Sequence, residues 1–184
     1  MVGTNDRYSL LDYCGDLSID RVIDLEVAMI DVKEFVKTLN NKPVAVFGLG
    51  ISNRAAIKAL KKAGAEVVAW DDDVHRRKET EKEGATLTDL AGEDMASFAC
   101  LVLAPGVPFH YPEPHPVVKK AQEAGIEIIC DLEILHRCNH GRRVIGITGT
   151  NGKSTTTALV GHVLKENSIS VAVGGNIGQA ALDL

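Results

Sequence analysis

A run of glycines followed by a lysine and hydroxyl residues is the feature of this sequence with the clearest chemistry. The run, between an apolar stretch and a helix-forming one, reads Thr148-Gly-Thr-Asn-Gly-Lys-Ser-Thr-Thr-Thr157. Glycines let backbone N–H groups turn inward, a helix N-terminus carries about half a positive charge, and a lysine reaches terminal phosphates. We therefore predict a phosphate-binding loop in which Lys153 contacts the β/γ-phosphates and the Ser154 hydroxyl ligates Mg²⁺.

The spacing of this loop differs from the common pattern G-x-x-x-x-G-K-[ST]. Counting back from Gly152, that pattern requires a glycine at position 147, where the chain has Ile147, and Gly146 lies one residue too early. The loop is therefore a variant. The alternative, a glycine turn that only caps a helix, does not account for the coincidence of strand, glycines, lysine and serine.

A second glycine turn, Gly48-Leu-Gly-Ile-Ser-Asn53, follows another apolar run. It resembles the dinucleotide fingerprint G-x-G-x-x-G, but Asn53 stands where the third glycine belongs, which counts against NAD. Asp71 ends the next apolar run and can accept a hydrogen bond from a ribose or a base. The turn predicts a ligand that contains a diphosphate, with a purely structural turn as the alternative.

Alternating strands and helices must position these turns. Short apolar runs predict strands at 44–47, 66–70, 85–87, 99–103 and 126–129. The segments between them have helical patterns, notably at 54–62, 74–83, 116–124 and 132–138. Strand–helix–strand repeats of this kind favour an α/β protein with a parallel, Rossmann-like sheet.

The remaining segments suggest three regions. Residues 1–40 form an N-terminal extension whose apolar residues predict one amphipathic helix from Ile19 to Leu39. Residues 41–140 form the Rossmann-like domain. Residues 141–184 begin a P-loop α/β domain, with strands expected at 144–147 and 170–173 and a helix at 153–166, and we expect it to be incomplete.

Composition excludes several classes of protein. Twenty basic against 25 acidic residues give a formal charge of −5, which disfavours nucleic-acid binding. No apolar run approaches the ~18 residues of a membrane span, and the N-terminus has no secretory signal. The four cysteines lack a C-x-x-C pair, which favours reduced thiols in the cytosol. His136, Cys138 and His140, with Cys130 nearby, match no zinc-ligand spacing.

Five motifs together resemble the Mur ligases of peptidoglycan synthesis, and among them the D-glutamate-adding branch. The likeness runs from about Lys42 to Leu184, whereas the first forty residues match nothing in the family. The motifs are Gly48-Leu-Gly50, Ala104-Pro-Gly106, Gly125-Ile-Glu-Ile with Asp131-Leu-Glu133, Gly149-Thr-Asn-Gly-Lys-Ser-Thr155 and Gly174-Gly-Asn-Ile-Gly178.

The resemblance implies a cytoplasmic, monomeric, ATP-dependent ligase of cell wall biogenesis and cell division. Such an enzyme adds D-glutamate to UDP-N-acetylmuramoyl-L-alanine through an acyl phosphate, with no nucleic-acid or membrane partner. The first domain would bind the UDP, and the second would bind ATP and Mg²⁺.

Carried over by position, the resemblance implies catalytic roles for Lys153 and Ser154, with Ser154 also ligating Mg²⁺. The implied ATP-binding residues are Gly149, Thr150, Asn151, Gly152, Lys153, Ser154 and Thr155. The implied substrate-binding residues are Ile51, Ser52, Asp71, Gly106 and Asn176.

Three departures from the family bear on these expectations. Asn53 replaces a residue that is usually glycine. Asp72 and Asp73 stand where the family often has a hydroxyl residue and an arginine, and two carboxylates there would repel a diphosphate. The family's later catalytic residues and C-terminal domain lie beyond Leu184, so we expect this polypeptide alone not to ligate. The alternatives are a non-catalytic UDP-sugar or nucleotide-binding fragment, an NAD-dependent oxidoreductase domain, and a related ligase that adds diaminopimelate or forms folylpolyglutamate.

Overall fold

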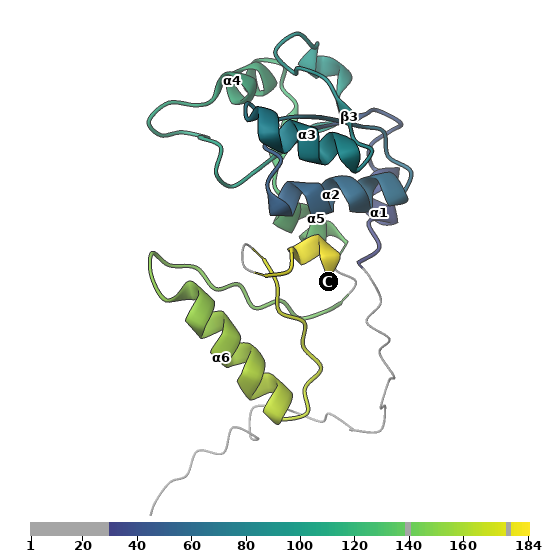
Figure 1. Cartoon of the computed structure of the whole chain (residues 1–184). Coiled ribbons are helices and arrows are strands. Elements are labelled where there is room, and N and C mark those ends of the chain that lie inside the picture. The colour runs from purple at the N-terminus through teal and green to yellow at the C-terminus, as the bar shows by residue number, and fades with distance from the viewer. Residues whose placement is uncertain (1–29, 139–140, 176–177) are drawn as a thin grey trace, which may run out of the picture.

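A computed structural model describes residues 30–138, 141–175 and 178–184 of the chain (Figure 1). Its centre is one five-stranded parallel sheet with the strand order β3-β2-β1-β4-β5. The strands are Val44–Phe47 (β1), Val67–Trp70 (β2), Thr86–Leu87 (β3), Cys100–Leu103 (β4) and Glu127–Ile129 (β5). The predicted α/β class with a parallel, Rossmann-like sheet is confirmed.

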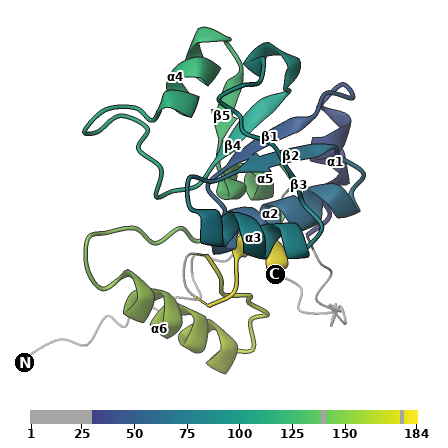
Figure 2. The ribbon, with the colours of Figure 1, turned by 45° about the horizontal axis from the view of Figure 1, so that its top comes forward.

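Helices cover both faces of the sheet (Figure 2). Helices α2 and α3 lie on one face and α4 lies on the other, as right-handed crossovers between parallel strands require. The helices are Lys33–Lys37 (α1), Ile51–Lys62 (α2), Val74–Lys82 (α3), Pro116–Glu123 (α4), Asp131–Arg137 (α5) and Lys153–Glu166 (α6), with 3₁₀ turns at Met95–Ser97 (η1) and Ala181–Asp183 (η2). Within the described ranges, no helix is both long and apolar enough to cross a bilayer.

The central strands are apolar throughout because both faces of the sheet are buried. In β1, Val44 and Val46 belong to the cluster under α1, α2 and α5, whereas Ala45 and Phe47 belong to the cluster under α4. All four side chains are at most 5% exposed. The alternation of side chains along the strand therefore divides one short run between two cores.

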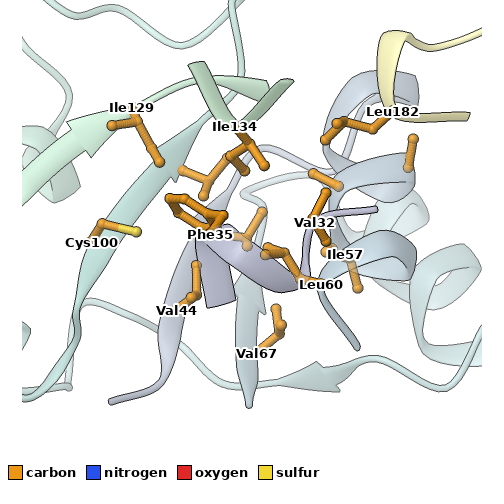
Figure 3. Close-up of a cluster of buried hydrophobic side chains, with 14 of the residues drawn as sticks. Val32, Phe35, Val44, Ile57, Leu60, Val67, Cys100, Ile129, Ile134 and Leu182 are labelled. Atoms are coloured by element: carbon orange, nitrogen blue, oxygen red, sulfur yellow. The ribbon is translucent and has the colours of Figure 1, made fainter. Parts of the chain in front are cut away.

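The larger core receives a contribution from the far end of the chain. Leu182 of η2 belongs to the same buried cluster as Phe35, Ile57 and Ile134, which come from α1, α2 and α5, and η2 itself lies against α2 and α5 (Figure 3). Ala180 and Ala181 are buried beside it. The core beneath α2 and α5 is therefore built from residues of both predicted regions, 41–140 and 141–184, together with α1.

Several predicted elements differ from the structure. The helix expected from Ile19 to Leu39 is described only from residue 30 onward, and there it is limited to α1; its earlier part lies outside the described residues. The strands expected at 144–147 and 170–173 are wrong, since neither segment pairs with a strand in the described part of the chain. A strand needs a partner for its backbone N–H and C=O groups, and the local pattern does not supply one. Helix α6 matches its predicted bounds.

Candidate functional site

A cavity of about 430 Å³ opens at the carboxyl ends of the central strands. The strand register aligns Phe47 with Trp70 and with Leu103, so the residues that follow these three meet at one edge of the sheet. Chain connections leave β1 and β4 in opposite directions here, and parallel α/β proteins bind ligands at such a switch point. Four residues implied as substrate-binding line the cavity, namely Ile51, Ser52, Asp71 and Gly106. Asn176 lies outside the described residues.

The glycine turn forms one wall of the cavity. Gly48 has a φ of +88°, and a Cβ added to it would lie 2.6 Å from the Cβ of Ala104, so only glycine fits. Gly50 precedes α2, which begins without a side-chain cap. The first N–H groups of a helix have no partners within it and carry partial positive charge. The turn and the helix start together suit a phosphate group.

Asp71 connects this turn to the neighbouring strand. Its carboxylate is buried and accepts hydrogen bonds from the backbone N–H of Leu49 at 2.6 Å and of Asp73 at 2.8 Å. The guanidinium of Arg76 lies 3.5 Å from the same carboxylate. The structure therefore gives Asp71 a role in holding the turn, beside the predicted contact with a ribose or base.

Asn53 replaces the third glycine of the fingerprint and is completely buried. Its Nδ2 donates a hydrogen bond to the carbonyl of Phe47 at 3.0 Å, whereas its Oδ1 has no hydrogen-bond partner. The side chain thus fills the contact between α2 and the end of β1. This arrangement explains how the helix packs on the strand without the glycine.

The two other acidic residues after β2 have partners of their own. Asp73 caps α3 by accepting from the backbone N–H of His75 at 2.8 Å, and this hydrogen bond lowers the pKa of its carboxyl. Asp72 lines the cavity and lies 3.0 Å from Nε2 of His115.

Sequence reasoning missed two residues that line this cavity, Arg76 and His115. The side chain of His115 is only 21% exposed. Its position immediately before Pro116 marks it as the N-cap of α4, which is the signal that was available. Arg76 has no comparable signal, because its role depends on where α3 starts relative to Asp71.

The phosphate-binding loop predicted at 148–157 is separate from this cavity, whose lining comes from residues 47–115. Gly152 adopts a left-handed conformation with φ of 77° and precedes α6, a 14-residue helix without a side-chain cap. The Lys153 ammonium donates to the carbonyls of Gly149 and Thr150, and Ser154 is exposed. An uncapped helix start beside a lysine and an exposed hydroxyl fits a phosphate group with Mg²⁺.

A second cavity of about 420 Å³ lies across the Ala104–Val107 segment, at the ends of β4 and β5. Its charged groups are already paired, because Arg137 contacts both Glu127 and Glu133. The hydrogen bond from Arg137 lowers the pKa of the Glu127 carboxyl. The charged side chains that line the second cavity are therefore engaged with one another.

A parallel sheet with a glycine turn and an uncapped helix at its switch point is the arrangement of Rossmann-like folds. Comparison with known proteins adds relatives that are similar in sequence. The chain is similar in sequence to ligases of the Mur family, as its motifs predicted. It is 46% identical over 149 residues to the UDP-N-acetylmuramoylalanine–D-glutamate ligase of Paramagnetospirillum magneticum, covering 81% of this chain and 33% of the relative. It is 49% identical over 160 residues to the ligase of the same name from Rhodopseudomonas palustris, covering 85% and 33%.

The chain therefore spans about a third of the length of these curated relatives. No protein-family profile matches it. Among solved structures, shikimate dehydrogenase from Aquifex aeolicus is similar with a TM-score of 0.43 and 20% identity, covering 63% of this chain and 57% of that one.

Proposed function

We propose that this chain binds UDP-N-acetylmuramoyl-L-alanine and ATP for an ATP-dependent ligase that adds D-glutamate to the UDP-sugar. The observation that carries the proposal is the convergence of Ile51, Ser52, Asp71 and Gly106 on one cavity beside the glycine turn. Those residues come from separate segments of the chain, and the resemblance had implied all of them as substrate contacts.

In this proposal the diphosphate of the UDP-sugar lies against the start of α2. The N–H groups there and the Arg76 guanidinium supply positive charge, and Arg76 is half-exposed and so able to reach a ligand. Asp71 keeps the turn in place through Leu49 and retains acceptor capacity for a ribose or a base.

The loop from Gly149 to Thr155 would hold ATP with Mg²⁺. Lys153 would exchange its contacts with the loop carbonyls for the β/γ-phosphates, and Ser154 would ligate the Mg²⁺. ATP would supply the phosphoryl group that activates the carboxylate of the acceptor. Neutralising the charge on the transferred group is the contribution expected from the lysine and the helix start.

Calorimetric titration of the 184-residue chain tests the proposal. UDP-N-acetylmuramoyl-L-alanine, UDP, NAD and ATP·Mg²⁺ are titrated separately. We expect the UDP compounds to bind the cavity and ATP·Mg²⁺ to bind the loop, so that Lys153→Ala weakens ATP binding at least tenfold and leaves UDP binding unchanged. Binding of NAD without binding of the UDP compounds would overturn the proposal.

A second candidate function is binding of the UDP-sugar without chemistry. It is favoured by the finding that no residue from 149 to 155 lines the cavity. Phosphate release on mixing the chain with the UDP-sugar, D-glutamate and ATP·Mg²⁺ separates the two. Release that requires D-glutamate supports catalysis by this polypeptide, and its absence, with UDP-sugar binding intact, supports the binding role.

A further inference from the structure

Three consecutive carboxylates follow β2 at the edge of the proposed diphosphate site. Carboxylates near a negatively charged ligand weaken its binding unless the protein restrains them or neutralises their charge. Backbone N–H groups hold two of the three, because Asp71 accepts from Leu49 and Asp73, and Asp73 accepts from His75. Asp72 differs, because its partner is a side chain, that of His115.

His115 is fixed as a hydrogen-bond donor to Asp72. The backbone N–H of Val117 points at its Nδ1 from 3.3 Å, so this nitrogen acts as an acceptor and carries no proton. The proton of the neutral ring is therefore on Nε2, which lies 3.0 Å from Oδ2 of Asp72.

The ring of His115 is also held in place by packing. It lies against Phe47 with the ring centroids 4.5 Å apart, and the backbone N–H of His115 donates to the carbonyl of Pro108 at 2.9 Å. The residue thus joins the end of β1, α4 and the proline-rich loop of residues 105–116. Asp72 has no such support, since its side chain is 71% exposed.

We propose that His115 is a positioning residue that restrains the Asp72 carboxylate at the rim of the cavity and so lets an anionic ligand enter. The proposal rests on the function proposed above, with a diphosphate in this cavity. Without the Nε2–H donor, the Asp72 side chain is free to rotate toward the phosphates. His115 then acts through Asp72 and needs no contact with the ligand.

The test measures UDP and uridine binding to the full 184-residue chain by calorimetry. His115→Asn retains an acceptor for the Val117 N–H, because asparagine is a good N-cap, but is too short to reach Asp72. We expect this variant to bind UDP three- to tenfold more weakly and uridine equally well. Adding Asp72→Asn should restore UDP binding to within twofold of the wild type. His110→Ala, at an exposed histidine of the same loop, is the matched control.

Thermal melts by circular dichroism confirm that each variant is folded. Weaker UDP binding that Asp72→Asn does not restore would show that His115 only stabilises the loop, and the inference would be wrong. Unchanged UDP binding in His115→Asn would overturn it as well, while leaving the UDP site intact. A wild-type chain that binds neither UDP nor its sugar would instead remove the proposed function, and the inference with it.

Discussion

The backbone N–H of Leu49 donates a hydrogen bond of 2.6 Å to the buried carboxylate of Asp71. This contact joins the glycine turn after β1 to the residue that ends β2. Buried hydrogen bonds to charged groups are among the stronger ones in proteins. The shape of the cavity therefore depends on a carboxylate that sequence reasoning assigned to ligand binding alone.

Replacing Asp71 should accordingly destabilise the fold as well as weaken binding. In Asp71→Asn the side chain keeps one oxygen, so it cannot accept from both Leu49 and Asp73, and we expect the free energy of unfolding to fall by about 1–3 kcal/mol. Urea denaturation followed by circular dichroism measures this. Asp72→Asn is the control, and its exposed pair with His115 should contribute no more than about 1 kcal/mol. Equal losses in the two variants would contradict the assignment.

Gly48 should be intolerant of any side chain. Gly48→Ala meets both a left-handed backbone and a contact of 2.6 Å with Ala104, whereas Gly64→Ala meets only the backbone conformation, with φ of +92° and open space. We expect Gly64→Ala to cost about 1–2 kcal/mol. Gly48→Ala should cost at least about 1 kcal/mol more because of overpacking. Chemical denaturation of both variants tests this, and similar losses would show that Ala104 moves aside.

Asn53→Asp should be strongly destabilising at neutral pH. The change puts a carboxylate, in place of an N–H donor, against the carbonyl of Phe47 at a fully buried position, and we expect a loss of about 3 kcal/mol or more. Asn41→Asp, at an exposed position, should change stability by less than about 0.5 kcal/mol.

The penalty in Asn53→Asp should also depend on pH. Burial disfavours the charged form, so the pKa of the new carboxyl is higher in the folded chain than in the unfolded one. The penalty is therefore complete above the folded pKa and shrinks as the pH falls toward the unfolded value near 4. Urea denaturation at pH 7 and pH 4.5 measures the change, and a constant difference between variant and wild type would refute the explanation.

Leu182→Ala tests whether η2 contributes to the larger core, the one beneath α2 and α5. Leu182 is 5% exposed among side chains of α1, α2 and α5, so its truncation should cost about 2–4 kcal/mol. Leu159 on α6 is 59% exposed, and Leu159→Ala should cost less than about 0.5 kcal/mol. If the Leu182 variant unfolds at the same urea concentration as the wild type, η2 does not support this core.

Thiol reactivity should follow burial. Burial raises the pKa of the Cys100 thiol to about 12, and it also raises that of Cys138. Because the thiolate is the reactive form, we expect iodoacetamide at pH 8 to alkylate the half-buried Cys130 well before either of them. Peptide mass spectrometry of the native chain, with a urea-unfolded sample as reference, measures each site. Alkylation of Cys100 as fast as Cys130 would contradict the buried placement.

Much of the fold could be predicted because its signals are local. Short apolar runs predicted the five strands of the sheet, and the helical pattern at 116–124 predicted α4. The same reasoning failed for 144–147 and 170–173, because a strand also needs a partner elsewhere in the chain. An apolar run by itself does not say whether that partner is present.

The sequence by itself determined the five strands of the sheet and the helices between them, the two glycine turns and the resemblance to the Mur ligases, since each depends on residues close together in the chain. Only the tertiary structure decided that His115 hydrogen-bonds to Asp72 across 43 residues, that Leu182 packs into the larger core, and that Asp71 accepts a hydrogen bond from Leu49. The physical reason is that hydrogen bonds and packing join whatever the sheet register brings within reach. No spacing along the chain encodes that register.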